Sequence, residues 1–331
     1  MNAKLGACVA GVLMLAPGAA SADCKLLQLA EFHVDPHWRS PIVDGAVNGQ
    51  PVKVLLDTGA TTSIVQRRAA SQLGLSFFVV PGMRLYGIGG DTAVYETHIK
   101  EFKVGDLVKP DLNLEVGGDA DRGFEASVIL GYDFLAKVSV EFDLAHNAVR
   151  LFRHEGCTPP QLIYWGAAYS QAQMLDEDKQ APSIQTFAEV NGKRVLAELD
   201  SGAGTTVIDT AAAAVAGVQR PTDVATERMQ GLGVQLQDSW TGKFDSFALG
   251  DEKISNVKMQ VLNMATKMTY SETGSLIPRQ LNSTPGMFVG ADFFRAHRIM
   301  IDPEDHLILF SYVGGPVFVT PQPTSVAPNK K

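Results

Sequence analysis

The sequence predicts an all-β protein built from two copies of one domain. Three observations lead to this prediction. The same series of short motifs occurs in the same order in each half of the chain. Apolar segments of strand length, separated by turn residues, dominate the sequence. The length of 331 residues fits two domains of roughly 100–200 residues each.

The repeat begins with a strand that runs into an acidic loop. The segment 47–60 reads VNGQPVKVLLDTGA, and it aligns without a gap with the segment 190–203, which reads VNGKRVLAELDSGA. Four more pairs of motifs follow in the same order: YGIG with QGLG, FKVGD with FALGD, ILGYDF with FVGADF, and VEFD with IMID. Chance can produce one such match but not the ordered series, so the halves are copies of one ancestral domain.

Each copy predicts the same elements in the same order. The Val-Asn-Gly segment that opens the repeat is typical of a β-hairpin turn, and a short apolar strand then leads to Asp57 or Asp200. The elements expected after these aspartates are short helices at 66–73 and 209–216, half-buried strands across 102–116 and 247–262, and another short helix after each apolar-apolar-Gly motif.

The first 22 residues have the pattern of a signal peptide. Lys4 precedes a short apolar run, and Ala-Ser-Ala at 20–22 forms a cleavage site. The run is far shorter than the ~20 residues of a membrane span. We therefore expect an exported protein, periplasmic or secreted, without a stable membrane anchor after cleavage. The expected divisions are a signal peptide 1–22, an N-terminal lobe 23–156, a linker 157–182, a C-terminal lobe 183–313 and a flexible tail 314–331.

Composition excludes several kinds of partner. The formal net charge of −8 argues against nucleic acid, which requires a basic face. The histidines are scattered and form no cluster with cysteines, so we expect no metal and no cofactor. Cleavage leaves Cys24 and Cys157, and an even pair in an exported chain favours a disulfide. Two unpaired, buried thiols are the alternative.

A pair of carboxylates is predicted at Asp57 and Asp200, where the two apolar strands end. In each loop the glycine lets the backbone turn tightly, and the hydroxyl residue can hydrogen-bond across the turn. Two carboxyls in close contact do not both ionise easily. The charged one can take a proton from a water, while the protonated one donates to the carbonyl oxygen of an amide. The supporting loop residues are Thr58, Gly59, Ser201 and Gly202.

The sequence resembles the retropepsin-like and pepsin-like aspartic peptidases over residues 40–152 and 184–312. The matching motifs are the two aspartate loops, the Tyr-Gly-Ile-Gly-Gly segment at 86–90 and the apolar-apolar-Gly segments at 129–131 and 288–290. The resemblance implies a bilobal, pseudo-twofold acid-protease fold in which each lobe is a small closed β-barrel with a short helix. It also implies that Asp57 and Asp200 are the catalytic pair and that Thr58 and Ser201 interlock the two loops.

By the same resemblance, one hairpin closes over the substrate as a flap. Its residues are Tyr86, Gly87, Ile88 and Gly89. The second copy has Gln230 where the first has Tyr86, so we expect one working flap or two unequal flaps. Both loops have alanine after the glycine, at Ala60 and Ala203, where pepsins usually place a hydroxyl residue. Because a donor to the carboxylate is lost, we expect a pH optimum closer to neutral than that of a stomach enzyme.

The function predicted from these features is an aspartic-type endopeptidase. Its partner would be an extended polypeptide substrate, bound as a strand in the cleft between the lobes. A monomer is expected, because one chain supplies both aspartates. Two alternatives stay open: a catalytically weak or inactive peptide-binding module of the same fold in the cell envelope, and a structural protein that uses the fold as a scaffold.

Overall fold

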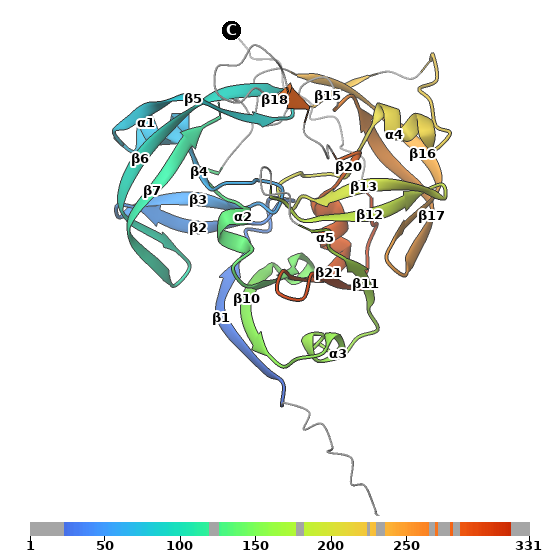
Figure 1. Ribbon diagram of the computed structural model, residues 1–331, viewed down its shortest axis with the longest axis horizontal. Helices are drawn as coiled ribbons and strands as arrows, with labels where there is room; N and C mark the ends of the chain where they lie inside the picture. Colours follow the sequence, from blue (N-terminus) through green and yellow to red (C-terminus); the bar gives the residue numbers. More distant parts are fainter. Residues whose placement is uncertain are drawn as a thin grey trace, which may run out of the picture.

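The structure of the chain is a computed structural model that describes residues 23–118, 126–176, 182–223, 226–229, 236–264, 269–270, 279–280 and 285–318. Two β-rich lobes lie side by side above a shared sheet (Figure 1). Only short helices accompany the strands, which confirms the predicted all-β class. Among the described residues, no helix has the length and apolar character needed to cross a membrane.

The first lobe is a closed barrel with one extra strand. Its sheet has the order β2-β3-β8-β4-β7-β6-β5, and pairing of β2 with β6 closes six strands into a ring. Closure leaves these six strands without a free edge. The strands are β2 (Ile42–Val47), β3 (Gln50–Leu56), β4 (Ile64–Gln66), β5 (Phe77–Gly87), β6 (Gly90–Val104), β7 (Leu107–Gly117) and β8 (Val128–Leu130).

The second lobe repeats this topology strand for strand. Its order is β12-β13-β20-β14-β17-β16-β15, and pairing of β12 with β16 closes the ring. The strands are β12 (Gln185–Val190), β13 (Lys193–Leu199), β14 (Val207–Asp209), β15 (Glu227–Met229), β16 (Gln237–Leu249), β17 (Glu252–Leu262) and β20 (Met287–Val289). The identical order confirms that the sequence repeat is a structural repeat. Two further short strands, β18 (Thr269–Tyr270) and β19 (Arg279–Gln280), pair with each other.

The hairpins and helices lie where the repeat predicts them. Asn48 and Asn191 have φ of 51° and 50°, and each precedes a glycine that also has positive φ, as a two-residue hairpin turn of this kind requires. The helices are α1 (Arg67–Gln72) and α4 (Thr210–Val215) after the aspartate loops, and α2 (Tyr132–Leu135) and α5 (Ala291–Ala296) after the apolar-apolar-Gly motifs. The described part of each lobe therefore has two short helices at equivalent places.

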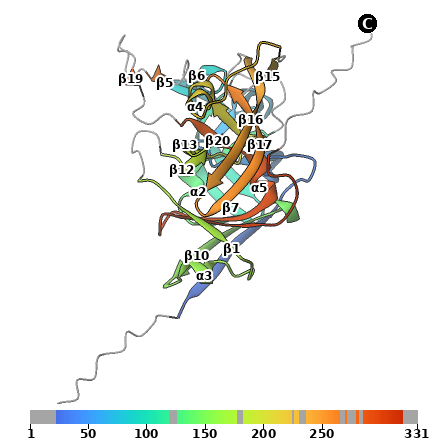
Figure 2. The same cartoon turned by 90° about the vertical axis from the view of Figure 1, so that its right-hand side faces the viewer.

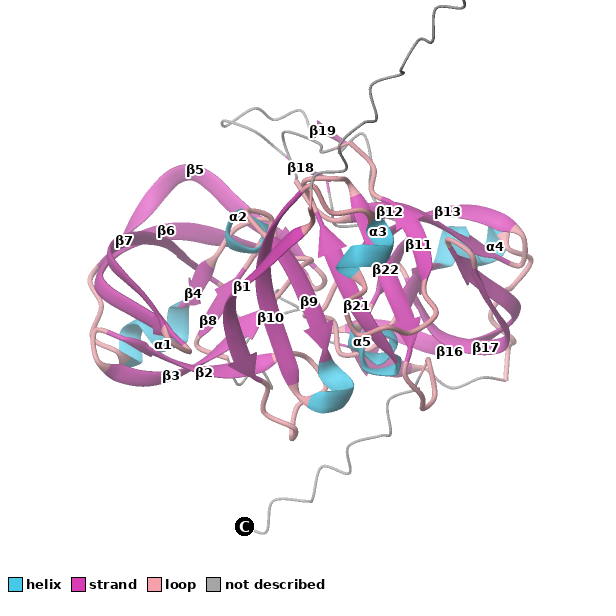
Figure 3. Ribbon diagram, turned by 90° about the horizontal axis from the view of Figure 1, so that it is seen from below, coloured by secondary structure: helices cyan, strands magenta, loops and turns pink. Residues whose placement is uncertain are grey.

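A six-stranded sheet joins the lobes from below. Figure 3 shows its central strands side by side, and Figure 2 shows strands of this sheet beneath the second lobe. The seam is the antiparallel pair β9–β21, in which Glu141 faces Met300. The strands in order are β1 (Lys25–His33), β10 (Ala148–Glu155), β9 (Ser139–Asp143), β21 (His297–Asp302), β22 (Leu307–Tyr312) and β11 (Ser170–Gln173). Because each half supplies strands, this sheet is shared by the two halves of the chain.

Segments at the predicted boundaries contribute to the fold. The predicted linker provides β11 and a short helix, α3 (Pro159–Leu162), and a 3₁₀ turn (Leu144–His146) precedes β10. Cys24 and Cys157 form the predicted disulfide, which ties the start of β1 to the end of the first lobe. Phe318 packs edge-on against Phe247 with ring centres 5.0 Å apart. The packed part of the second lobe thus extends past Val313, while residues 1–22 and 319–331 lie outside the described residues.

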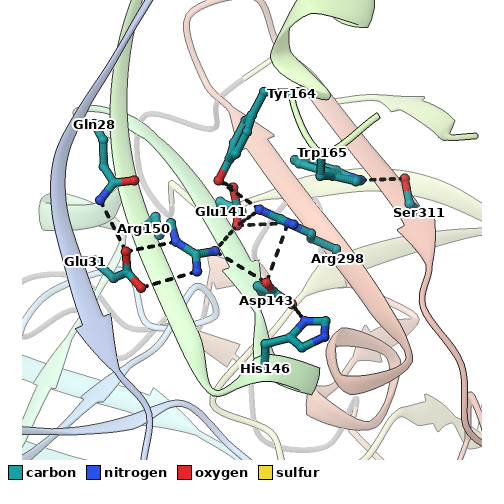
Figure 4. A network of polar contacts seen from close by, with 10 residues as sticks. All are labelled: Gln28, Glu31, Glu141, Asp143, His146, Arg150, Tyr164, Trp165, Arg298 and Ser311. Carbon is teal, nitrogen blue, oxygen red and sulfur yellow. Dashed lines mark hydrogen bonds and ion pairs between the residues drawn. The ribbon is translucent and has the colours of Figure 1, made fainter. Parts of the chain in front are cut away.

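A buried carboxylate connects the halves across the seam. Glu141 on β9 is fully buried and accepts hydrogen bonds from Arg150, Tyr164 and Arg298 (Figure 4). Arg150 comes from the first half and Arg298 from the second. The two guanidinium groups also reach Asp143, which belongs to a motif that recurs in both halves. The recurring aspartate is therefore structural in this copy, as part of the seam between the halves.

Candidate active site

Each candidate aspartate is fixed by its own barrel. The end of the strand before it is buried, and the strand pairs in parallel with the strand of the apolar-apolar-Gly motif. The backbone N–H of Asp57 donates to the carbonyl of Leu130, and that of Asp200 donates to the carbonyl of Val289, both at 2.9 Å. The two aspartates therefore occupy equivalent ends of β3 and β13, on rigid supports.

The loops of the two lobes interlock through their hydroxyl residues. Thr58 Oγ1 donates to the carbonyl of Leu199 at 2.6 Å, and Ser201 Oγ donates to the carbonyl of Leu56 at 2.7 Å. In return, the Thr58 N–H donates to Ser201 Oγ at 3.0 Å, and the Ser201 N–H donates to Thr58 Oγ1 at 2.9 Å. Both side chains are fully buried. This is the arrangement that the resemblance implies, and it locks one loop to the other.

The glycines allow the carboxyls of opposite lobes to approach. A Cβ on Gly59 would lie 2.5 Å from Cγ of Asp200, and a Cβ on Gly202 would lie equally close to the carboxyl of Asp57. Within each lobe, the Gly59 N–H donates to Asp57 at 2.9 Å and the Ala203 N–H donates to Asp200 at 2.8 Å. The structure thus brings all six predicted loop residues together at one point between the lobes.

The two carboxyls form one titrating unit. The carboxyls of Asp57 and Asp200 lie close enough for each to affect the pKa of the other. Desolvation raises the pKa of Asp57 well above its usual value, and the neighbouring charge of Asp200 raises it further. Desolvation also raises the pKa of Asp200, against the donation from Ala203 and Asp57. The arrangement therefore favours a pair with one proton and one negative charge.

The predicted flap residues form the tip of the β5–β6 hairpin. Tyr86 faces Asp91 and Gly87 faces Gly90 across the two strands. At the turn between them, Ile88 reaches the second lobe, where it packs against the apolar side chains Val207, Leu262, Met264 and Phe288. A small cavity between the tip and this surface is lined in part by Gln237 and Asn263. The β5–β6 hairpin of the first lobe thus contacts the second lobe at its tip.

The corresponding hairpin of the second lobe is formed by β15 and β16. Met229 at the end of β15 packs near the same apolar cluster as Ile88. The motif that includes Gln230 and aligns with the first flap lies outside the described residues.

Residues outside the predicted set also hold the site. Ser40, which precedes the first repeat strand, donates to the carbonyl of Gly202 at 3.0 Å, and Arg39 donates to the carbonyl of Gly204 at 3.3 Å. Glu198, two residues before Asp200, is buried, and its charge contributes to the raised pKa of Asp57. The aligned repeat contained a signal for Glu198, because the matching residue in the first copy is Leu55.

The recurring aspartates of the apolar-apolar-Gly motifs support the loops rather than the carboxyl pair. Asp133 accepts from Ser63 Oγ at 2.6 Å, and Asp292 accepts from Thr206 Oγ1 at 2.6 Å. Within the described part of the chain, one group could hold a metal ion: His154, Asp302 and Asp305 in and beside the shared sheet. Asp302 already accepts from His154 and Ser139 there, so its oxygens have protein partners.

Comparison with protein families finds one match in each half of the chain. Residues 43–137 match the family described as "gag-polyprotein putative aspartyl protease", and residues 187–293 match the family described as "Aspartyl protease". Among solved structures, the chain is similar to a crystal structure of an aspartic proteinase from Irpex lacteus, with 12% sequence identity and a TM-score of 0.49. That alignment covers 86% of this chain and 97% of the other.

Proposed function

Since the chain belongs to the aspartic peptidases, with two aspartyl protease domains in tandem, we propose that it is an endopeptidase whose catalytic groups are Asp57 and Asp200. The observation that supports this most is the close approach of these two carboxyls, one from each domain, across Gly59 and Gly202. A pair assembled this way needs no second chain, so the active form is a monomer.

The reaction uses the shared proton of the pair. The charged carboxyl takes a proton from a water as its oxygen attacks the scissile carbonyl carbon, and the protonated carboxyl donates to the carbonyl oxygen. This is the established behaviour of the aspartic protease dyad, in which two adjacent carboxyls share one proton. The interlock through Thr58 and Ser201 holds the carboxyls in place, so little reorganisation is needed during the reaction.

The pH range of activity follows from the two pKa shifts. Activity requires that one of the two carboxyls is charged. On the acidic side of the pH–activity profile, activity therefore rises where the pair loses its first proton. Desolvation raises the pKa of both carboxyls, and this moves that rise upward from the usual range of a carboxyl. On the basic side of the profile, activity falls where the second proton leaves. The mutual repulsion of the charged Asp57 and Asp200 raises the pKa of this second step. The optimum therefore lies closer to neutral than pH 3.

Export to the periplasm or the medium is part of the proposal. The signal-like segment at 1–22 and the disulfide between Cys24 and Cys157 support it, because disulfides persist in oxidising compartments. The substrate would be an extended segment of an exported or envelope protein, held between the lobes under the β5–β6 hairpin.

The test is cleavage of an unfolded protein by residues 23–331 between pH 3 and pH 8. Asp57→Asn and Asp200→Asn should each reduce kcat by about a thousandfold or more, because the pair acts as a unit. A general aspartic-peptidase inhibitor should also abolish cleavage. Asp106→Asn and Asp251→Asn are matched controls at equivalent exposed hairpin turns, and they should keep full activity.

Two results would overturn the proposal. Cleavage that survives both dyad substitutions would assign the activity to other residues or to a contaminant. No cleavage by the wild type at any pH, together with peptide binding that survives the substitutions, would favour the peptide-binding module instead.

A further inference from the structure

One pair of facing residues breaks the symmetry between the lobes beside the dyad. In the first lobe, Ile42 on β2 faces Leu55 on β3, and both are buried in an apolar cluster. At the equivalent place in the second lobe, Gln185 on β12 faces Glu198 on β13. An apolar pair in one copy is therefore a polar, acidic pair in the other, although the surrounding strands have the same topology.

The Glu198 side chain shares a strand face with the catalytic aspartate. Val195, Ala197 and Leu199 point into the apolar core of the lobe. Because side chains alternate along a strand, Glu198 lies on the opposite face, two positions before Asp200. Its charge raises the pKa of Asp57, and the charge of Asp200 raises the pKa of Glu198 in turn. Glu198 thus borders the dyad on its second-lobe side.

The carboxyl of Glu198 has neutral partners. The side chains of Ser183 and Gln185 hydrogen-bond to it, and its cross-strand neighbour on β20 is Phe288. None of the ion pairs between described residues involves Glu198, although the residue is only 6% exposed. Burying a carboxyl without a cation is unfavourable, and the first lobe shows that this fold accepts leucine in the same place.

We infer that Glu198 and Gln185 form a polar subsite that binds a lysine or arginine side chain of the substrate directly next to the scissile bond. This inference rests on the proposed peptidase function. The equivalent apolar pair, Ile42 and Leu55, receives an apolar side chain on the other side of the bond. The peptide cation supplies the partner that Glu198 lacks, in a charge-assisted hydrogen bond that excludes water. The preferred sequence then has one apolar and one basic residue flanking the bond.

Binding of the cation is coupled to a proton. Burial, followed by the charge of Asp200, raises the pKa of Glu198 to about 8, so the free carboxyl is mostly protonated at neutral pH. Pairing with a cation requires the charged form, so the proton leaves to solvent. Among the described residues, the titratable groups whose charges act with that of Glu198 are Asp57 and Asp200, and its strand neighbours Gln185 and Phe288 carry no charge. The KM of a basic substrate should therefore rise about tenfold for each pH unit below 8.

The experiment compares peptides that differ only beside the scissile bond. One series has leucine on one side and lysine, arginine, glutamine or norleucine on the other, and a second series reverses the order. Norleucine matches the length of lysine without its charge. The wild type, residues 23–331, should cleave the lysine peptide with a kcat/KM about 10–100 times that of the norleucine peptide at pH 7. The order that gives this ratio identifies the side of the bond that contacts Glu198.

Substitution of Glu198 should reverse the preference. In Glu198→Leu, which copies Leu55, the norleucine peptide should become the better substrate. Glu198→Gln keeps the shape and the hydrogen bonds but removes the charge, so it covers the case in which the leucine variant does not fold. Glu115→Gln is the matched control. Glu115 is also a carboxyl with a pKa raised by burial, but its charged neighbours are Asp133 and Glu96 rather than the dyad. This control should leave the preference unchanged.

A binding arm separates failure of the subsite from failure of the peptidase function. Fluorescence anisotropy would measure binding of labelled lysine and norleucine peptides to Asp57→Asn, with and without Glu198→Leu. Tighter binding of the lysine peptide that depends on Glu198, with no cleavage by the wild type, would support the subsite and overturn the peptidase. Cleavage by the wild type with equal kcat/KM for lysine and norleucine, unchanged in both Glu198 variants, would overturn the subsite and leave the peptidase intact.

Discussion

Gly59 and Gly202 are the residues on which the geometry of the carboxyl pair depends. Any Cβ at either position would overlap the carboxyl of the opposite lobe. Neither glycine has positive φ, so their requirement comes from the close approach rather than from backbone conformation. The hydroxyls of Thr58 and Ser201 then bind backbone carbonyls of the opposite strand, so each loop completes the other.

Glu198 should make stability depend on pH. Its pKa is about 8 in the folded chain against 4.5 for a free glutamate, so the folded state disfavours the charged form. The resulting loss of stability is absent below the unfolded pKa and grows as pH rises from about 4.5 to 8. Glu198→Gln should match the wild type at pH 4 and exceed it by about 4 kcal/mol in free energy of unfolding at pH 8.

Urea unfolding at several pH values would measure this difference. Glu189→Gln, at an exposed position on the adjacent β12, serves as the control and should show no trend with pH. A constant difference between Glu198→Gln and the wild type from pH 4 to pH 8 would contradict the prediction.

At the scale of elements, the β5–β6 hairpin of the first lobe adds a contact with the second lobe at a distance along the chain from the aspartate loops. Its tip residue Ile88 contacts an apolar cluster formed by β14, β17 and β20 of the other barrel. The equivalent β15–β16 hairpin belongs to the same cluster through Met229. Ile88 of the first hairpin and Met229 of the second therefore pack against the same apolar cluster.

Truncation of the tip residue should weaken substrate binding. Ile88→Ala removes apolar contacts that hold the hairpin closed, at a cost of about 1–1.5 kcal/mol. We expect KM for an unfolded protein substrate to rise roughly fivefold to tenfold, with a smaller change in kcat. Val108→Ala, at an exposed position near the turn of the β6–β7 hairpin, should change neither constant. A decrease in KM for Ile88→Ala would mean instead that the tip competes with the substrate.

The disulfide anchors β1 at the outer edge of the shared sheet. It closes a loop of 133 residues, and constraint of so long a loop in the unfolded chain is worth about 2–5 kcal/mol. The double variant Cys24→Ser/Cys157→Ser should lose that stability and show a lower Tm. Reduction of the wild type should give the same shift and have no further effect on the variant. Equal Tm values before and after reduction would exclude a stabilising role.

At the scale of the whole molecule, the shared sheet fixes the relation between the two barrels. Its seam joins β9 of the first half to β21 of the second, and the Arg150–Glu141–Arg298 cluster lies across that seam. Tyr164, from the segment between the lobes, donates to the same carboxylate, and desolvation with the charge of Glu141 raises its pKa to about 12. The halves are therefore bound together below the carboxyl pair as well as at it.

Removal of the central carboxylate should destabilise the whole chain. Glu141→Ala removes the shortest ion pair of two largely buried guanidinium groups and leaves them the longer contacts with Asp143, and we expect a loss of about 3 kcal/mol in free energy of unfolding. Glu31→Ala removes a partly exposed carboxylate from the same network and should cost less than about 1 kcal/mol. Similar losses for the two variants, measured by urea unfolding, would contradict a special role for the seam.

The sequence by itself determined the repeat, and with it most of the site. Two matched motifs ending in Asp57 and Asp200 predicted equivalent strands, helices and hairpins, because apolar periodicity and turn residues act locally. The pairing of the carboxyls and the interlock of Thr58 with Ser201 followed from the twofold relation and from the resemblance to known peptidases. The disulfide was expected from the even pair of cysteines that follows the signal-like segment.

Only the tertiary structure decided what depends on contacts between distant segments. The shared sheet places a strand from the predicted linker beside a strand from the second copy, and no local pattern encodes that pairing. The contact of Ser40 with the Asp200 loop and the contact of Ile88 with the second barrel likewise join one copy of the repeat to the other. The role of Glu198 also required the fold, because its importance comes from the strand face it shares with Asp200 and the burial that this position imposes.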